Sequence, residues 1–288
     1  GNNTAVGRSS LYSNTTGSNN SAFGFYALLS NTTNNNSAFG YKALNANTTG
    51  TYNAAVGFSA LATNTTGSFN SAFGLNALRY NTIGANNTAV GYQALLNNST
   101  GSNNSSFGHQ SLRYNTIGTN NIAFGAYALN LNTTGSSNIA IGRSSLQSNT
   151  IGINNTAVGY QSLLANTTGN HNTAVGLTSL SGNTFGKYNT AVGMGSLQSN
   201  TTGNNNTGFG YAVLRLNTTG LNNTAVGYQS LYYNTVGSGN TAVGLGSLLN
   251  NTVSNNSAFG YKALFSNTTG VVNTAVGYAS LSSNTTGN

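Results

Sequence analysis

The chain has 288 residues, a formal net charge of +8, and no Asp, Glu, Pro, Cys or Trp. Without carboxylate side chains it lacks the usual general acids and bases of hydrolases, the oxygen ligands of Ca²⁺ and Mg²⁺ sites, and the orienting member of a Ser-His-Asp triad. We therefore expect a non-enzymatic protein with no catalytic residues, no cofactor and no metal site. Neither disulfides nor zinc can stabilise the fold through cysteine.

A tetrapeptide of the type Thr-Ala-Val-Gly recurs seventeen times, with a regular spacing of seventeen that shortens to sixteen at two places. The consensus unit is N-(T/S)-A-(V/F)-G-(Y/L)-x-(A/S)-L-x-x-N-T-(T/I)-G-x-x, in which both Asn, the first Gly and the Leu never vary. A unit of this length cannot bury a face alone, so neighbouring units must stack and share a core. The invariant Gly of the first three units are Gly7, Gly24 and Gly40.

The first element of each unit is a short β-prone segment, such as residues 4–6. Its Val or Phe, the invariant Leu five residues later (Leu11, Leu28 and Leu44 in the first units) and the Thr, Ile or Val five further on are spaced like three walls of a narrow coil. We predict an all-β fold, a parallel β-solenoid or β-roll of seventeen coils, with one repeat unit per coil and a triangular cross-section.

The segment between the first Gly and the second Asn allows a second interpretation. The run from Gly91 to Asn97 tolerates a helical turn, so a leucine-rich-repeat-like unit of one strand and one helical turn stays open. After this segment, the Gly that closes Asn-Thr-Thr-Gly marks a turn for which we predict positive φ. The two short units carry Asn34 and Ser254 where this Gly is expected.

Two Asn columns are predicted to form structural ladders, in which each side-chain amide hydrogen-bonds to its equivalent one coil away at about 4.8 Å. One column begins with Asn3, Asn20, Asn36 and Asn53, and the other with Asn14, Asn31, Asn47 and Asn64. The second column also reads as Asn-Thr-Thr glycosylation sequons. Buried ladders exclude glycosylation, so the upstream Asn2, Asn86 and Asn154 become the better acceptors.

The variable positions provide the candidate surface groups. The Tyr after the first Gly, at Tyr41, Tyr92, Tyr160 and Tyr228 among others, is expected to make surface aromatic contacts with a neighbouring chain or with sugars. His109 and His171 occupy different repeat positions, which argues against a metal pair. The eight cations are spread at about one per two units, whereas nucleic-acid-binding proteins concentrate charge on one face, so we expect no nucleic-acid partner.

The array covers residues 1–288 as one domain, with no shift of composition and no divergent unit at either end. A solenoid that ends in solution needs capping units, so this pattern predicts an array that continues, within a longer fibre or by end-to-end joining of copies. No apolar run approaches the length of a membrane-spanning helix, and we expect no membrane insertion.

Units such as Asn87-Thr-Ala-Val-Gly-Tyr-Gln-Ala-Leu95 and Asn223-Thr-Ala-Val-Gly-Tyr-Gln-Ser-Leu231 resemble the tandem repeats of phage and viral tail-fibre proteins and of large bacterial surface proteins. More distantly, the Ala-Val-Gly core is similar to the β-roll head repeats of trimeric autotransporter adhesins, whose repeat is shorter. The resemblance covers the whole chain and implies a fibre shaft or an adhesin stalk.

The sequence therefore predicts a self-assembling structural protein of an extracellular, cell-surface or virion fibre, with itself as partner. Two alternatives stay open. The repeats of an adhesin or a tail fibre can bind glycans, and regularly spaced Thr on a flat solenoid face resembles the surface of ice-binding β-solenoids.

Overall fold

The computed structural model describes residues 1–288 and contains seventeen β-strands and no helix. It therefore has no helix that is long and apolar enough to cross a membrane. Each strand has three residues and lies at the start of one repeat. The strands are β1 (Thr4–Val6), β2 (Ser21–Phe23), β3 (Ser37–Phe39), β4 (Ala54–Val56), β5 (Ser71–Phe73), β6 (Thr88–Val90), β7 (Ser105–Phe107), β8 (Ile122–Phe124), β9 (Ile139–Ile141), β10 (Thr156–Val158), β11 (Thr173–Val175), β12 (Thr190–Val192), β13 (Thr207–Phe209), β14 (Thr224–Val226), β15 (Thr241–Val243), β16 (Ser257–Phe259) and β17 (Thr274–Val276).

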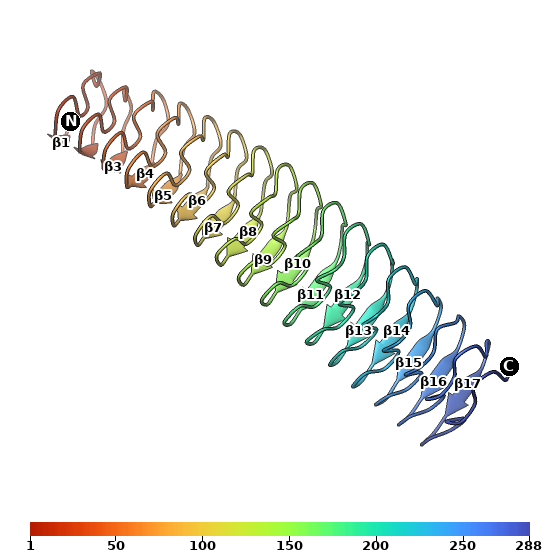
Figure 1. The fold of residues 1–288 in the computed structure, drawn as a ribbon. Helices are drawn as coiled ribbons and strands as arrows, with labels where there is room; N and C mark the ends of the chain where they lie inside the picture. Colours follow the sequence, from red (N-terminus) through yellow and green to blue (C-terminus); the bar gives the residue numbers. More distant parts are fainter. The chain divides into compact units, whose positions relative to one another are not determined.

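The chain divides into two compact units. The first comprises Gly1–Ser144 with Asn149–Ile151, and the second Ser145–Ser148 with Gly152–Asn288. Strands β1–β9 lie in the first unit and β10–β17 in the second (Figure 1). Within each unit consecutive strands pair in parallel and in register, as in Ala72 with Ala89 and Ala174 with Ala191. The predicted parallel β-solenoid, with one coil per repeat, is confirmed.

Backbone hydrogen bonds between coils are not confined to the strands. We number each coil from its first invariant Asn, so that in the coil of residues 87–103 Asn87 is position 1 and Asn98 is position 12. In this coil, backbone amides at positions 2, 7, 9 and 13 all donate to neighbouring coils. The bonds are Thr88 to Asn104 (2.9 Å), Gln93 to Leu75 (3.0 Å), Leu95 to Ser111 (3.0 Å) and Ser99 to Thr116 (2.9 Å).

Positions 5 to 12 form two consecutive turns instead of a helical turn. The amide of Ala94 donates to the carbonyl of Gly91, and that of Asn98 to the carbonyl of Leu95. Gln93 and Leu95 have φ values of 53° and 52°, in the left-handed region, which a right-handed helix cannot contain. The leucine-rich-repeat-like alternative is therefore wrong. Since a left-handed residue costs about 1–2 kcal/mol, only contacts with adjacent coils can maintain this path.

The core consists of columns of small and polar residues around one column of Leu. Ala89 at position 3, Ala94 at position 8 and Leu95 at position 9 are fully buried, as are both Asn. In the coil that follows, Ser replaces Ala at positions 3 and 8, and the hydroxyl groups of Ser106 and Ser111 lie 2.6 Å apart. Positions 3 and 8 therefore face each other across an interior only two small side chains thick.

The prediction that the Val/Phe column and the Thr/Ile/Val column line the interior is wrong. Val56 and Phe73 at position 4 are exposed, and so are Ile83 and Ile117 at position 14. Side chains alternate along a strand, so inward Ala at position 3 places positions 2 and 4 outside. Of the three predicted walls, only the Leu column is buried.

The turn after the second Asn also differs from expectation. Gly84, at position 15, is not among the residues with positive φ. Instead, a Cβ atom on Gly84 would overlap the carbonyl oxygen of Gly101 in the next coil, and it would lie 2.5 Å from Asn81 Oδ1 and 2.9 Å from Asn98 Nδ2. Glycine is required there because the backbone of the next coil and the Asn side chains approach it closely.

The two short coils lack the residue at position 14. They keep a residue at position 15, where full coils have Gly. The carbonyl of Thr33 accepts a hydrogen bond from Asn20 Nδ2 at 2.7 Å, and that of Val253 from Asn240 Nδ2 at 2.8 Å. In a full coil the position-15 Gly accepts this bond, as Gly50 does from Asn36. Thr33 and Val253 thus take the place that alignment of the repeats assigned to Asn34 and Ser254.

One coil tests how tightly positions 3 and 8 are coupled. In this coil Gly208 occupies position 3, and Val213, which is fully buried, occupies position 8. A Cβ atom on Gly208 would lie 2.7 Å from Ser196 Oγ and 3.4 Å from Val213 Cγ1. We expect Gly208→Ala to lower the free energy of unfolding by about 1–3 kcal/mol through overpacking.

Adding Ser196→Ala to Gly208→Ala removes the atom that the new Cβ would approach most closely, and it should recover most of that loss. A double-mutant cycle in urea, followed by circular dichroism, measures the coupling. Additive effects of the two substitutions would contradict the cross-core contact.

Candidate functional site

Between coils of full length, the Asn at position 12 are hydrogen-bonded in series. Asn64 Nδ2 donates to Asn47 Oδ1 at 2.8 Å and to the carbonyl of Gly67 at 2.9 Å. Asn47 Nδ2 in turn donates to Asn31 Oδ1 at 2.7 Å and to the carbonyl of Gly50 at 2.9 Å. Both amide hydrogens of these fully buried side chains are thereby used. The column thereby supplies these buried polar groups with partners. It is interrupted at the second short coil, where Asn251 Nδ2 donates only to the carbonyl of Val253 and Asn234 Oδ1 is buried without a partner.

The Asn at position 1 form a second series. Asn53 donates both its backbone amide (3.0 Å) and its Nδ2 (3.2 Å) to Asn36 Oδ1. Its Nδ2 also donates to the carbonyl of Gly67 at 2.9 Å, the same carbonyl that Asn64 of the other column contacts. The backbone amide of Asn36 donates likewise to Asn20 Oδ1 at 2.9 Å. The position-15 carbonyl therefore ties the two columns together within each coil.

In the first coil, the two Asn columns begin with Asn3 and Asn14. Asn3 Nδ2 and Asn14 Nδ2 both donate to the carbonyl of Gly17, at 2.7 and 3.0 Å. Leu11 is 9% exposed, whereas Leu28 and Leu44 are fully buried.

The invariant glycines at position 5 all have positive φ, with 127° at Gly7, 134° at Gly24 and 139° at Gly40.

The burial of position 12 leads to a prediction about the sequons. Asn47 and Asn64 are fully buried with both Nδ2 hydrogens donated, whereas Asn86 and Asn154 are exposed. We expect an oligosaccharyltransferase acting on the folded chain to modify Asn86 and Asn154 but neither buried Asn. Peptide mass spectrometry measures the occupancy, with the unfolded chain as the control that exposes all sequons. Modification of folded Asn47 would contradict the ladder geometry.

The aromatic side chains at position 6 form exposed columns. Tyr41 stacks on Phe25 and on Phe58, with ring centroids 5.4 and 4.8 Å away, and Tyr211 stacks on Tyr228 at 5.1 Å. Tyr41, Tyr92, Tyr160 and Tyr228 are all exposed. Because the stacked rings cover each other's faces, they present their edges and hydroxyl groups to solvent. The sequence did not predict this orientation.

The two histidines lie in separate aromatic stacks. His109 packs against Tyr92 at 5.1 Å and against Tyr127 at 5.2 Å, and His171 stacks on Tyr188 at 5.0 Å. No group of three or more His, Cys, Asp or Glu residues that could hold a metal ion occurs in the chain.

The fold gathers the cations at three coil positions, although the sequence spaces them evenly. Positions 6, 7 and 10 lie together: Lys262 Nζ (position 7) is 5.3 Å from the Tyr261 ring (position 6) and 5.1 Å from the Phe265 ring (position 10). In each of the two units we call the surface formed by these three positions the cation face. The two cation faces together carry seven of the eight Lys and Arg residues and all six Gln. They are Arg8 and Arg143 at position 6, Lys42 and Lys262 at position 7, and Arg79, Arg113 and Arg215 at position 10, with Gln93, Gln110, Gln161 and Gln229 at position 7 and Gln147 and Gln198 at position 10.

Only Lys187, at position 16, lies off this surface. The even spacing of the cations along the sequence therefore does not disperse them around the coil.

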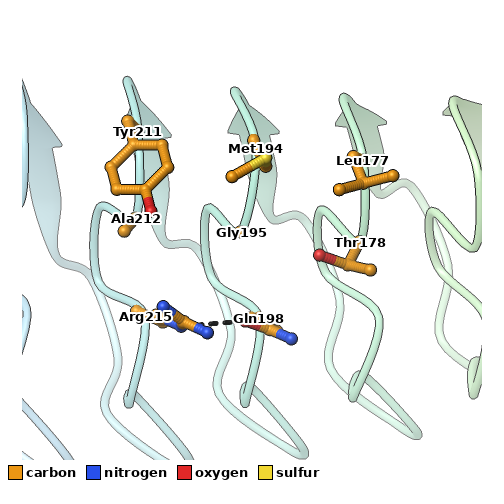
Figure 2. Close-up of a pocket in the computed structure, with 8 residues that line it drawn as sticks. All are labelled: Leu177, Thr178, Met194, Gly195, Gln198, Tyr211, Ala212 and Arg215. Carbon is orange, nitrogen blue, oxygen red and sulfur yellow. Dashed lines mark hydrogen bonds between the residues drawn. The ribbon is translucent and has the colours of Figure 1, made fainter.

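A shallow pocket lies on the cation face of the second unit (Figure 2). It is lined by Leu177, Thr178, Met194, Gly195, Gln198, Tyr211, Ala212 and Arg215, all of which occupy cation-face positions in three successive coils. The pocket exists because Gly195 and Ala212 are small where other coils carry Gln or Lys. Arg215 Nε donates to Gln198 Oε1 at 2.9 Å, which fixes the guanidinium along one side.

Comparison of the chain with protein-family models, with curated proteins and with solved structures finds no match. Its function therefore has to be argued from its own geometry.

Proposed function

We propose that this protein is a non-enzymatic structural element of an extracellular or virion fibre, in which stacked coils form the shaft and copies of the chain assemble. The observation that carries the proposal is the uniformity of the coil interfaces. Paired strands join equivalent residues, and between coils of full length both Asn columns repeat the same hydrogen bonds. A chain built for catalysis or for one ligand would depart from this pattern at its site.

The chemistry of the chain is consistent with this role. It offers no carboxylate side chain for acid-base catalysis. Val, Ile and Phe at position 4, many of them exposed to solvent, form an apolar column of the kind that soluble monomers seldom leave uncovered. The apolar column at position 4 carries no charged side chain in any coil, so the net charge of +8 does not lie on the surface that copies would bury.

The test is assembly of the purified chain, followed by analytical ultracentrifugation and electron microscopy over a range of concentrations. We expect concentration-dependent growth of filaments, with a diffraction repeat of about 4.8 Å along the coil-stacking direction. A chain that stays a monodisperse monomer at every concentration, while its circular dichroism spectrum shows that it is folded, would contradict the assembly role.

A further inference from the structure

The cation face of the first unit carries a regular row of charges. Its five cations, Arg8, Lys42, Arg79, Arg113 and Arg143, lie in the first, third, fifth, seventh and ninth coils. Adjacent parallel strands are about 4.8 Å apart, so a cation recurs about every 9.5 Å along the face. The row belongs wholly to the residues Gly1–Ser144.

None of these cations has an ionic partner among the side chains, because the chain contains no Asp or Glu. Four of them lie over aromatic rings instead: Arg8 over Phe25 (5.6 Å), Lys42 over Tyr41 (5.3 Å), Arg79 over Tyr80 (5.1 Å) and Arg113 over Tyr114 (4.9 Å). A ring orients a cation but leaves its charge uncompensated. Arg113 Nε is in addition buried without a hydrogen-bond partner. The row is thus pre-positioned to receive anions.

Neutral hydrogen-bonding groups lie on the same face, in the coils of the cations and in the coil between Arg79 and Arg113. Gln110 Nε2 donates to Gln93 Oε1 at 3.2 Å, which aligns two amides along the face. Tyr41 and Tyr92 add phenol groups at exposed ring edges. Amide and phenol groups of this kind donate to and accept from hydroxyl groups, so the face offers partners for hydroxyl groups as well as for anions.

We propose that the cation face of the first unit binds a linear acidic polysaccharide laid along the stacked coils, with about one carboxylate or sulfate per disaccharide. The interval of two coils is comparable with the length of a disaccharide in an extended chain. The Gln and Tyr groups on the same face meet the sugar hydroxyls. This binding does not depend on the fibre role, since a single chain carries the complete row.

Nucleic acid fits the same face less well. Phosphates follow one another at about 3.4 Å per strand in a duplex, which is much closer than the cations. Proteins that bind single strands stack bases on open aromatic faces, whereas the rings around Tyr41 cover each other's faces. A polyanion with sparse charges and many hydroxyl groups is the better match.

The test measures binding of hyaluronan, which has one carboxylate per disaccharide, to the full chain by biolayer interferometry at low and at physiological ionic strength. We expect binding that weakens with salt. Replacing the five cations together (Arg8→Gln, Lys42→Gln, Arg79→Gln, Arg113→Gln and Arg143→Gln) should weaken it at least about tenfold, because a linear array of ion contacts is lost. Circular dichroism checks that the variant keeps the solenoid.

A charge-matched variant separates the face from net charge. It combines the five Gln substitutions with five Lys at position 17, seven positions beyond the last cation-face position. These substitutions are Asn19→Lys, Asn86→Lys, Asn103→Lys, Asn120→Lys and Ser137→Lys, all at exposed residues. We expect no recovery of hyaluronan binding, and recovery would overturn the proposal in favour of nonspecific attraction.

Further outcomes would also overturn it. These are the absence of hyaluronan binding by the wild type at low salt, retained binding by the five-Gln variant, or equal binding of neutral dextran. Tighter binding of an oligothymidylate of equal charge would instead assign the face to nucleic acid. Tighter binding of phosphatidylserine vesicles would assign it to an anionic membrane surface.

Discussion

Gly74→Ala lowers the free energy of unfolding by about 3–5 kcal/mol, the sum of a backbone strain and a steric overlap. Gly74, at position 5, has a φ of 136°, which an L-residue with a side chain avoids. A Cβ atom there would lie 2.5 Å from the carbonyl oxygen and 2.8 Å from the carbonyl carbon of Gly91 in the next coil. Backbone atoms cannot rotate away as a side chain can, so the coils must separate locally.

The matched control is Gly246→Ala. Gly246, at position 7, has a φ of 62°, and a Cβ atom there would have no neighbouring atom nearer than 3.5 Å. Ala212 and Ala279 already occupy position 7 at φ values of 51° and 50°. We expect a change within about 1 kcal/mol. Urea unfolding with hydrogen exchange, which locates the weakened coils, measures both variants. Equal effects of the two substitutions would contradict the close approach at position 5.

Asn81→Asp is expected to cost about 3–5 kcal/mol at neutral pH, although it changes the side-chain volume very little. Asn81 Nδ2 donates to Asn64 Oδ1 at 2.8 Å and to the carbonyl of Gly84 at 2.9 Å. A carboxylate has no hydrogen to donate, so it would oppose both oxygens while being fully buried. Only the bond from Asn98 Nδ2 to its own oxygen is kept.

The loss should depend on pH in a definite direction. Burial among oxygen atoms raises the pKa of the introduced carboxyl above its unfolded value of about 3.9. The folded state then binds the proton more tightly, so stability falls as the pH rises from about 3.9 through the raised pKa, and the deficit shrinks at acid pH. The exposed control Asn86→Asp should show neither effect. A pH-independent deficit of Asn81→Asp would argue against a buried donor at this position.

Repetition made the architecture predictable. A short unit with invariant Asn, Gly and Leu has to stack, and stacking short β-prone segments gives a parallel solenoid. What failed was the assignment of sides. In a strand of three residues, a shift by one position exchanges the buried and the exposed side chains. Hydrophobicity alone favoured burial of Val56 and Phe73 over burial of the smaller Ala55 and Ala72.

The sequence did contain a signal for the correct assignment. Position 3 is Ala in all but two coils, and its two exceptions, Ser106 and Gly208, are also small. Position 4 varies between Val, Ile and Phe, which differ strongly in volume. A thin interior tolerates no change of volume, so constancy of size marks burial better than hydrophobicity does. The compensating pair of Gly208 and Val213 follows the same rule.

The cation face could not be predicted from the residue types at single coil positions. Arg79 and Arg143 occupy different positions in their coils, so neither a column nor a motif marks them. Both lie on the cation face because two consecutive turns place positions 6, 7 and 10 on one surface. That path depends on left-handed residues at positions 7 and 9, such as Gln93 and Leu95, which no local propensity predicts for Leu.

The identical register of neighbouring coils has a consequence for how the gene can change. Thr88 pairs with Ser105 and Thr173 with Thr190, so each coil meets its neighbour through the same set of positions. An in-frame deletion of residues 88–104 would join Asn87 to Ser105 and leave every column continuous. Unequal recombination between repeats can therefore lengthen or shorten the array by whole coils while each product folds, which makes array length a trait that selection can adjust separately from the fold.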